Sequence, residues 1–154
     1  MESKSASKVD SGKLVAGAVL AGIVINICDY VSNNFILAAD WEHVARIRNV
    51  DMADLSSTTA TATYVVVNML LGFLVVWTYA AIRPRLGRGP GTAVIAGFMV
   101  YAAQGLLMAT YAVAYFSWDV FIRAGLLMLV TILAGSLAGA WVYGEKGDEL
   151  LDLR

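Results

Sequence analysis

Residues 59–82 read TATATYVVVNMLLGFLVVWTYAAI and decide the fold class, because they contain no charged side chain. Two further uncharged runs follow, one between Arg88 and Asp119 and one between Arg123 and Glu145. An α-helix rises about 1.5 Å per residue, so roughly 20 apolar residues cross the hydrocarbon core of a bilayer. Each run is long enough to cross, and a soluble core in a chain of 154 residues would not hide three of them.

A fourth apolar run begins at Leu14 and is interrupted by Asp29 before it ends at Ala39. A cleaved signal peptide is the alternative for this run, but Asn26 follows too soon for a clean cleavage region and no A-x-A site lies nearby. We therefore predict an all-α integral membrane four-helix bundle with an antiparallel, up-down-up-down arrangement. The expected segments are a disordered cytoplasmic N-terminus at 1–12, a four-helix domain at 13–144 with helices at 13–39, 59–82, 92–116 and 120–143, and a cytoplasmic tail at 145–154.

The overall composition agrees with a membrane protein. Hydrophobic residues make up 59% of the chain and charged residues 15%, whereas soluble domains average about 45–50% and about 25%. The mean hydropathy is +0.69. The net charge is −1 and no block of Lys or Arg occurs, so we expect the lipid bilayer and not nucleic acid as a partner.

The distribution of Lys and Arg predicts the orientation, because cytoplasmic loops carry an excess of these residues. One side would hold Lys4, Lys8, Lys13, Arg83, Arg85, Arg88, Lys146 and Arg154, and the other would hold Arg46, Arg48 and Arg123. This imbalance predicts that both termini are cytoplasmic. The short cluster of Arg83, Arg85 and Arg88 is interpreted as a topology anchor, with binding of anionic lipid headgroups or docking to a partner as the alternative.

Small residues indicate where the helices approach one another, because close packing replaces the hydrophobic drive inside lipid. Each expected helix has one face that is smaller or more polar than the rest, and we predict that these four faces meet in the interior. The expected packing residues are Ala18, Gly22, Gly72, Gly135 and Gly139. Tyr64 is expected beside Asn68 and Gly72, and Met108 beside Gly97, Tyr101 and Gln104.

Asp29 is the sharpest candidate for function, because an acid inside a membrane span is costly and therefore rare. Asn26 and Asn33 lie on the same face of the helix. One interpretation is proton or cation coupling in a small transporter, and the other is a hydrogen-bonded structural acid. Asn68 and Gln104 either hold helices together through amide hydrogen bonds or line a ligand cavity with Asp29.

The remaining chemistry-bearing residues are few. The single Cys28 excludes an intrachain disulfide and a CxxC site, and the single His43 cannot build a His-rich metal centre. His43 is interpreted as an exposed residue at the membrane interface, with single axial ligation of a metal, haem or pigment as the alternative. No Ser/His/Asp arrangement, HExxH or Walker loop occurs, so we predict no enzyme activity, no catalytic residue, no metal and no cofactor.

Four stretches carry a resemblance to known proteins: AGAVLAGIVINI (16–27), FILAADW (35–41), VVWTYAAIRPRLGRGPGTAVIAG (75–97) and LAGAWVY (137–143). Together they make the chain similar to an uncharacterised family of small bacterial four-helix integral membrane proteins. The likeness covers most of residues 14–143 and is most specific between Trp77 and Gly97. It implies a multi-pass protein of the bacterial inner membrane and no known activity, so no functional residue is transferred.

Two functional hypotheses follow. The first is a non-enzymatic structural or accessory component of the membrane, acting through helix–helix contacts with itself as a homo-oligomer or with a larger complex. The second is a small proton- or cation-coupled transporter in which Asp29 is the coupling acid. In that second case Asn26, Asn33, Asn68 and Gln104 would line the path.

Overall fold

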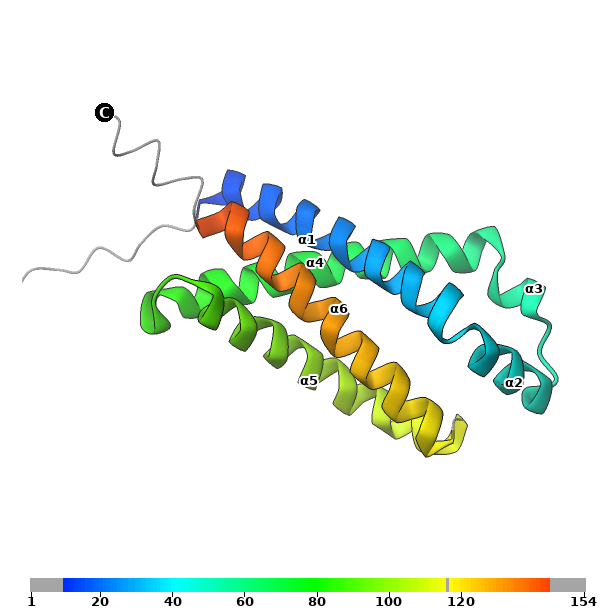
Figure 1. The fold of residues 1–154 in the computed structure, drawn as a ribbon. Helices are drawn as coiled ribbons and strands as arrows, with labels where there is room; N and C mark the ends of the chain where they lie inside the picture. The colour runs from blue at the N-terminus through cyan, green and yellow to red at the C-terminus, as the bar shows by residue number, and fades with distance from the viewer. Residues whose placement is uncertain (1–9, 116, 145–154) are drawn as a thin grey trace, which may run out of the picture.

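The computed structural model describes residues 10–115 and 117–144, with side chains throughout except at 55 and 111–115. This part of the chain is helical and contains no strand, and Figure 1 shows its long helices packed together in one bundle. The elements are α1 Ser11–Val31, the π-helix η1 Ser32–Ile36, α2 Ala38–Arg48, α3 Met52–Leu55, α4 Thr58–Leu86, α5 Pro90–Tyr115 and α6 Trp118–Gly144.

Four stretches are long and apolar enough to cross a membrane. They are Ser11–Ile36, Thr58–Leu86, Pro90–Thr110 and Trp118–Gly144. The prediction of an all-helical chain with four long apolar helices is therefore confirmed. These segments make the chain a candidate multi-pass membrane protein.

The first helix begins earlier than expected. Asp10 caps α1, because its Oδ1 accepts hydrogen bonds from the backbone N–H groups of Gly12 and Lys13. The expectation of disorder up to Gly12 is therefore wrong for residues 10–12. Residues 1–9 and the tail at 145–154 lie outside the described residues, and so do Lys4, Lys8, Lys146 and Arg154.

The first span does not continue as one α-helix to Ala39. Its α-helical part ends at Val31, a π-helical turn follows, and Leu37 separates that turn from α2. The turn is defined by the hydrogen bond from the backbone N–H of Leu37 to the carbonyl of Ser32, 2.9 Å long and spanning five residues. Hydrophobic periodicity does not distinguish a π-turn from an α-turn, so the sequence did not predict this break.

The second span is longer than expected, because α4 continues through Pro84 to Leu86. Pro84 has no backbone N–H to donate to the carbonyl of Ala80, but the hydrogen bond from the N–H of Gly87 to the carbonyl of Arg83, 2.9 Å long, still closes the last turn. The chain then turns through Gly87 and Gly89, whose φ angles of 86° and 125° favour glycine. Pro90 begins α5 at 90, not 92, because its fixed φ suits the first helical position. The fourth helix also begins earlier than the expected residue 120, at Trp118.

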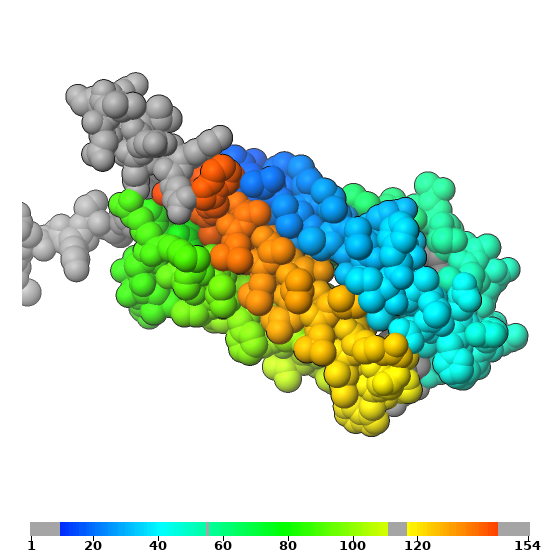
Figure 2. All heavy atoms as spheres, viewed as in Figure 1, coloured from blue at the N-terminus to red at the C-terminus, as the bar shows by residue number. Residues whose placement is uncertain are grey.

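The helix α1 packs mainly against α4 and α6, and α5 packs against α6 and α4. Figure 2 shows α6 lying between α1 and α5 on one face of the bundle. Glycines make the closest approaches. A Cβ on Gly72 would lie 2.3 Å from the backbone nitrogen of Gly22, and a Cβ on Gly17 would lie 2.7 Å from the carbonyl oxygen of Gly139.

The centre of the bundle is built from buried small and branched side chains on α1, α4, α5 and α6. They include Val75, Val76, Ala96 and Ile132, and the ring of Tyr79 is buried with them. Gly135 continues the close packing, since a Cβ there would lie 2.5 Å from Ile25.

Two residues expected on inward faces are exposed. Tyr64 is 60% exposed and Met108 is 50% exposed. Four residues advance a helix by about 400°, so residues eight apart diverge by about 80° around the axis. Asn68 and Gly72 are buried, and Tyr64 lies too far around α4 to share their contact with α1.

Candidate functional site

Asp29 in α1 accepts hydrogen bonds from two different elements. Its Oδ1 accepts from Nδ2 of Asn33 in η1 at 2.9 Å, and its Oδ2 accepts from Nδ2 of Asn68 in α4 at 3.1 Å. Both carboxyl oxygens therefore have amide donors. The structure brings together these three predicted site residues, which are 39 positions apart along the chain at their widest.

Asn26 completes the contact between α1 and α4. Its Oδ1 accepts from Nδ2 of Asn68 at 3.4 Å, and its Nδ2 donates to the carbonyl of Val65 in α4, also at 3.4 Å. The same Nδ2 donates to the carbonyl of Gly22, one turn earlier in α1, at 2.9 Å. Asn26 thereby contacts α4 through both ends of its amide.

The π-turn extends this group of hydrogen bonds to α2. Asn33 lies in the turn and donates to the backbone carbonyl of Asp29 as well as to its side chain, both at 2.9 Å. Its Oδ1 accepts from Nε1 of Trp41 in α2 at 2.9 Å. We call Asn26, Asp29, Asn33, Trp41 and Asn68 the amide cluster.

The position of Asn68 opposite Asp29 follows from the glycine contacts below it. Gly22 and Gly72 bring the backbones of α1 and α4 together, and Met69 packs on Gly22. Asn68 precedes Met69 and is 8% exposed. It therefore lies in the contact between α1 and α4, opposite Asp29. Asp29 itself is only half-buried.

The chemistry of the cluster is that of holding an acid in place. Its donors are side-chain amides and one indole, and neither group titrates in the ordinary pH range. Asp29 is therefore the titratable member of the cluster. Each hydrogen bond to Asp29 comes from a neighbouring element or turn, so the acid ties α1 to α4 and to η1.

Gln104 is not joined to the amide cluster by any hydrogen bond among the described residues. It lies on α5, and its Oε1 is buried without a hydrogen-bond partner there. The predicted grouping of Gln104 with the residues around Asp29 therefore has no contact that supports it.

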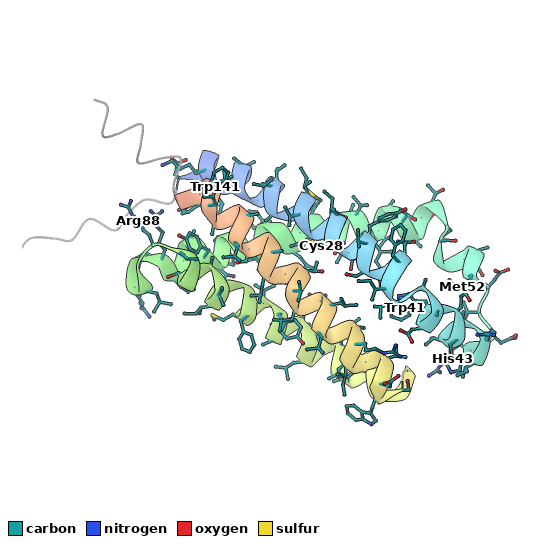
Figure 3. All side chains as sticks on the ribbon, viewed as in Figure 1. Cys28, Trp41, His43, Met52, Arg88 and Trp141 are labelled. Carbon is teal, nitrogen blue, oxygen red and sulfur yellow. The ribbon has the colours of Figure 1, made fainter. Side chains whose placement is uncertain are left out.

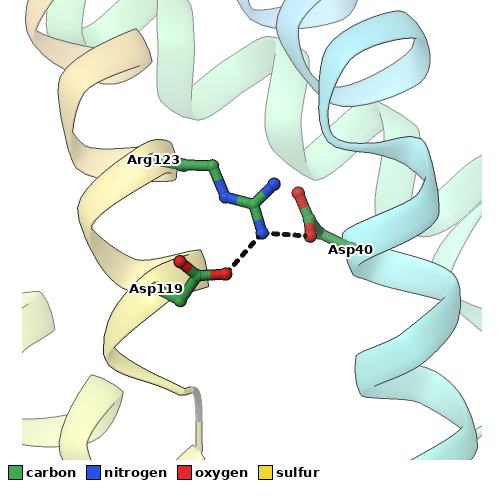
Figure 4. Close-up of polar contacts among 3 residues, drawn as sticks. All are labelled: Asp40, Asp119 and Arg123. Atoms are coloured by element: carbon green, nitrogen blue, oxygen red, sulfur yellow. Dashed lines mark hydrogen bonds and ion pairs between the residues drawn. The ribbon is translucent and has the colours of Figure 1, made fainter.

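An ion-pair group that joins α6 to α2 was not predicted. The Nη2 atom of Arg123 in α6 donates to Oδ1 of Asp40 in α2 at 2.8 Å and to Oδ2 of Asp119 at 2.7 Å. Figure 4 shows the guanidinium group between the two acids. The sequence shows the charges of Asp40 and Arg123, but it does not show that α2 lies beside α6.

The other predicted site residues lie apart from the amide cluster. His43 is exposed on α2, where Figure 3 labels it close to the end of the bundle. Among the described residues, no group of three or more His, Cys, Asp or Glu side chains could hold a metal ion. Arg85 and Arg88 are exposed, and the guanidinium carbon of Arg83 lies 5.6 Å from the centre of the Tyr143 ring.

Two hollows adjoin these elements. One of about 560 Å³ lies where α4, α5 and α6 meet beside the loop at 87–89. One of about 610 Å³ lies between α2 and α3. Neither is lined by a residue of the amide cluster.

Comparison of this chain with protein-family models, curated proteins and solved structures finds no match. The interpretation of the site therefore depends on its geometry.

Proposed function

We propose that the chain is a non-enzymatic, four-span protein of the bacterial inner membrane, a structural or accessory component that acts through helix–helix contacts. The amide cluster is the observation that carries this proposal. Both oxygens of Asp29 accept amide hydrogen bonds that join α1 to α4 and η1. An acid held in this way fixes the arrangement of helices, which is what a protein that presents helix faces to a partner requires.

The antiparallel arrangement and the cytoplasmic termini belong to this proposal. Contacts between α1 and α6 support the arrangement, because Gly17 meets Gly139 while Ile25 meets Gly135, in opposite order along the two helices. The excess of Lys and Arg near the termini and in the loop at 83–88 supports the orientation. Reporter fusions that fold on one side of the membrane only, placed at each terminus and after Asn49, measure it directly.

A face of α5 is the candidate surface for contact with another chain. Gly105 and Ala109 are one turn apart and half-buried, and no described atom lies within 4 Å of where a Cβ on Gly105 would be. Small residues of this spacing let a helix of another chain approach closely. A homo-oligomer or a larger membrane complex would use such a face.

Mass measurement of the full chain after extraction in mild detergent tests the accessory function. We expect a particle heavier than one chain, and we expect Gly105→Leu to release the monomer. The matched control is Leu106→Ala on the neighbouring exposed face, which should leave the mass unchanged. A monodisperse wild-type monomer with no partner contradicts the proposal.

Proton- or cation-coupled transport is the second candidate, and the half-buried position of Asp29 within a span is the observation that favours it. In this function Asp29 is the coupling acid, and Asn26, Asn33, Asn68 and Gln104 line the path. Flux into proteoliposomes is the test, with Asp29→Asn compared against Asn34→Ala, which alters an exposed amide next to the cluster. Flux that depends on pH in the wild type and is unchanged in Asp29→Asn rules out this role.

A further inference from the structure

The cavity of about 560 Å³ lies at the end of the bundle where α4 ends and α5 begins. Three helices and the connecting loop contribute to its wall. Its lining includes Tyr79, Arg88, Pro90, Ala93, Leu137 and Trp141. Because the spans end here, the cavity lies at the level of the lipid headgroups if the four helices cross the membrane as proposed.

One side of this cavity is cationic. Arg88 lines it directly. Figure 3 shows Arg88 and Trp141 at the same end of the bundle. The start of α5 at Pro90 adds the positive end of a long helix dipole to the same wall. The charge favours an anion.

Tyr79, Ala93 and Ala140 line the buried side of the cavity, and its outer wall is apolar. Tyr79 is 2% exposed, and its hydroxyl oxygen accepts a hydrogen bond from the backbone N–H of Gly89 at 3.4 Å. A phenol can donate as well as accept, so Tyr79 brings a donor to the buried side. Leu137 and Trp141 lie on the outward face of α6, 38% and 50% exposed.

We infer that this cavity binds one anionic phospholipid. The phosphate lies beside Arg88 and the hydroxyl of Tyr79, and an acyl chain follows the outward face of α6 over Leu137 and Trp141. A soluble phosphate compound shares the headgroup chemistry but would leave that apolar face in water. The lipid accounts for both the cationic and the apolar wall. This inference rests on the proposed membrane placement of the chain.

Native mass spectrometry of the full-length protein tests the inference. The protein is released from zwitterionic phosphatidylcholine nanodiscs that contain a small fraction of phosphatidylglycerol, and retained lipids are counted. We expect one phosphatidylglycerol to be retained in preference to phosphatidylcholine. A hydrogen bond to a charged group changes an equilibrium constant by about tenfold or more, so Arg88→Gln should lower retention about tenfold.

Arg85→Gln is the matched control. It removes the same charge three residues before Arg88, and the Arg85 side chain does not line the cavity. Retention should therefore fall less in Arg85→Gln than in Arg88→Gln. Equal losses in the two variants overturn the inference, since they indicate diffuse attraction to the surface. Tyr79→Phe keeps the ring and removes the hydroxyl, and it should also lower retention.

Two further arms separate the ligand source and the membrane placement. Inorganic phosphate in excess should not displace the retained phosphatidylglycerol, and complete displacement by phosphate overturns the lipid assignment. Resistance of the protein to alkaline extraction from vesicles reports membrane insertion independently of lipid type. Protein that inserts but shows no preference for phosphatidylglycerol contradicts this inference alone, whereas protein that does not insert contradicts the proposed function.

Discussion

The two halves of the first span, made of α1 and η1, are joined to their neighbours by different means. From Gly17 to Gly22 the helix lies against α4 and α6 through glycine contacts, with backbone atoms close to backbone atoms. From Asn26 to Asn33 it is joined through side-chain hydrogen bonds to Asn68, Val65 and Trp41. In lipid, where apolar contact between helices gains little over apolar contact with acyl chains, close packing and polar bonds are the two ways to hold helices together.

The difference has a geometric consequence. Glycine contacts fix the distance between two helix axes, because nothing can yield when one backbone meets another. Side-chain hydrogen bonds fix the rotation and register of the helices, since donors and acceptors must meet at about 3 Å. We therefore expect the glycine half to contribute more to stability and the amide half to contribute more to specificity of arrangement.

Substitution of Gly72 should have the largest effect. Its Cβ in Gly72→Ala would meet the backbone of Gly22 at 2.3 Å, so one helix must move. We expect a loss of about 2–3 kcal/mol, which is typical of overpacking that cannot be relieved by a side-chain rotation. The measurement is the free energy of unfolding in mixed micelles of mild detergent and dodecyl sulfate, followed by far-ultraviolet circular dichroism.

Gly91→Ala is the control for that substitution. Gly91 also lies in a long helix, but no group from elsewhere in the described structure lies within 4 Å of where its Cβ would be. Alanine is the better helix former, so the stability should stay the same or rise by up to about 1 kcal/mol. Equal losses in Gly72→Ala and Gly91→Ala would show that the approach of α1 to α4 is not the source of stability in the glycine half.

Removal of the amide of Asn68 should have an intermediate effect. Asn68→Ala leaves Oδ2 of Asp29 and Oδ1 of Asn26 without this donor. We expect a loss of about 1–2 kcal/mol, the range for interhelical hydrogen bonds in membranes. The same unfolding measurement applies. Asn34→Ala is the control, because the exposed amide of Asn34 donates only one turn back to Tyr30, and a comparable loss there would contradict the special position of Asn68.

The ion-pair group around Arg123 should have the smallest effect. Asp40→Asn weakens the link from α2 to α6, and exposed pairs of this kind contribute about 0.2–1 kcal/mol. The effect should shrink in 1 M salt, where the Debye length falls to about 3 Å. Asp119→Asn is matched, since Asp119 is also an acid in the first turn of its helix but pairs within α6. A larger loss in Asp119→Asn would show that the link to α2 contributes nothing.

The four apolar helices could be predicted because length and hydropathy are properties of each segment by itself. The face that carries Asn26, Asp29 and Asn33 could be read from helical spacing. In the structure Asn68 donates to Asn26 and Asp29, and Asn33 donates to Asp29. The bond from Trp41 to Asn33 could not be predicted, because it depends on the π-turn. Tyr64 was placed wrongly because spacing of four residues drifts around a helix over two steps.

The pairing of Arg123 with Asp40 also could not be predicted. The two residues are 83 positions apart, and only the tertiary structure shows that α2 and α6 are neighbours. The end of α4 was also predicted wrongly, since the expected helix stopped at Ile82 and α4 continues to Leu86. Pro84 removes a single backbone donor, and the hydrogen bond from Gly87 to Arg83 still forms beyond it.

The π-turn at Ser32–Ile36 makes the number of residues between Asp29 and Asp40 part of the architecture. A π-turn is equivalent to one residue inserted into an α-helix, so deletion of a single residue there would restore α-helical geometry and rotate everything beyond it by about 100°. Trp41 would then leave Asn33, and Asp40 would leave Arg123, in one step. For this stretch of the chain, a change of length is a more severe mutation than almost any change of side chain.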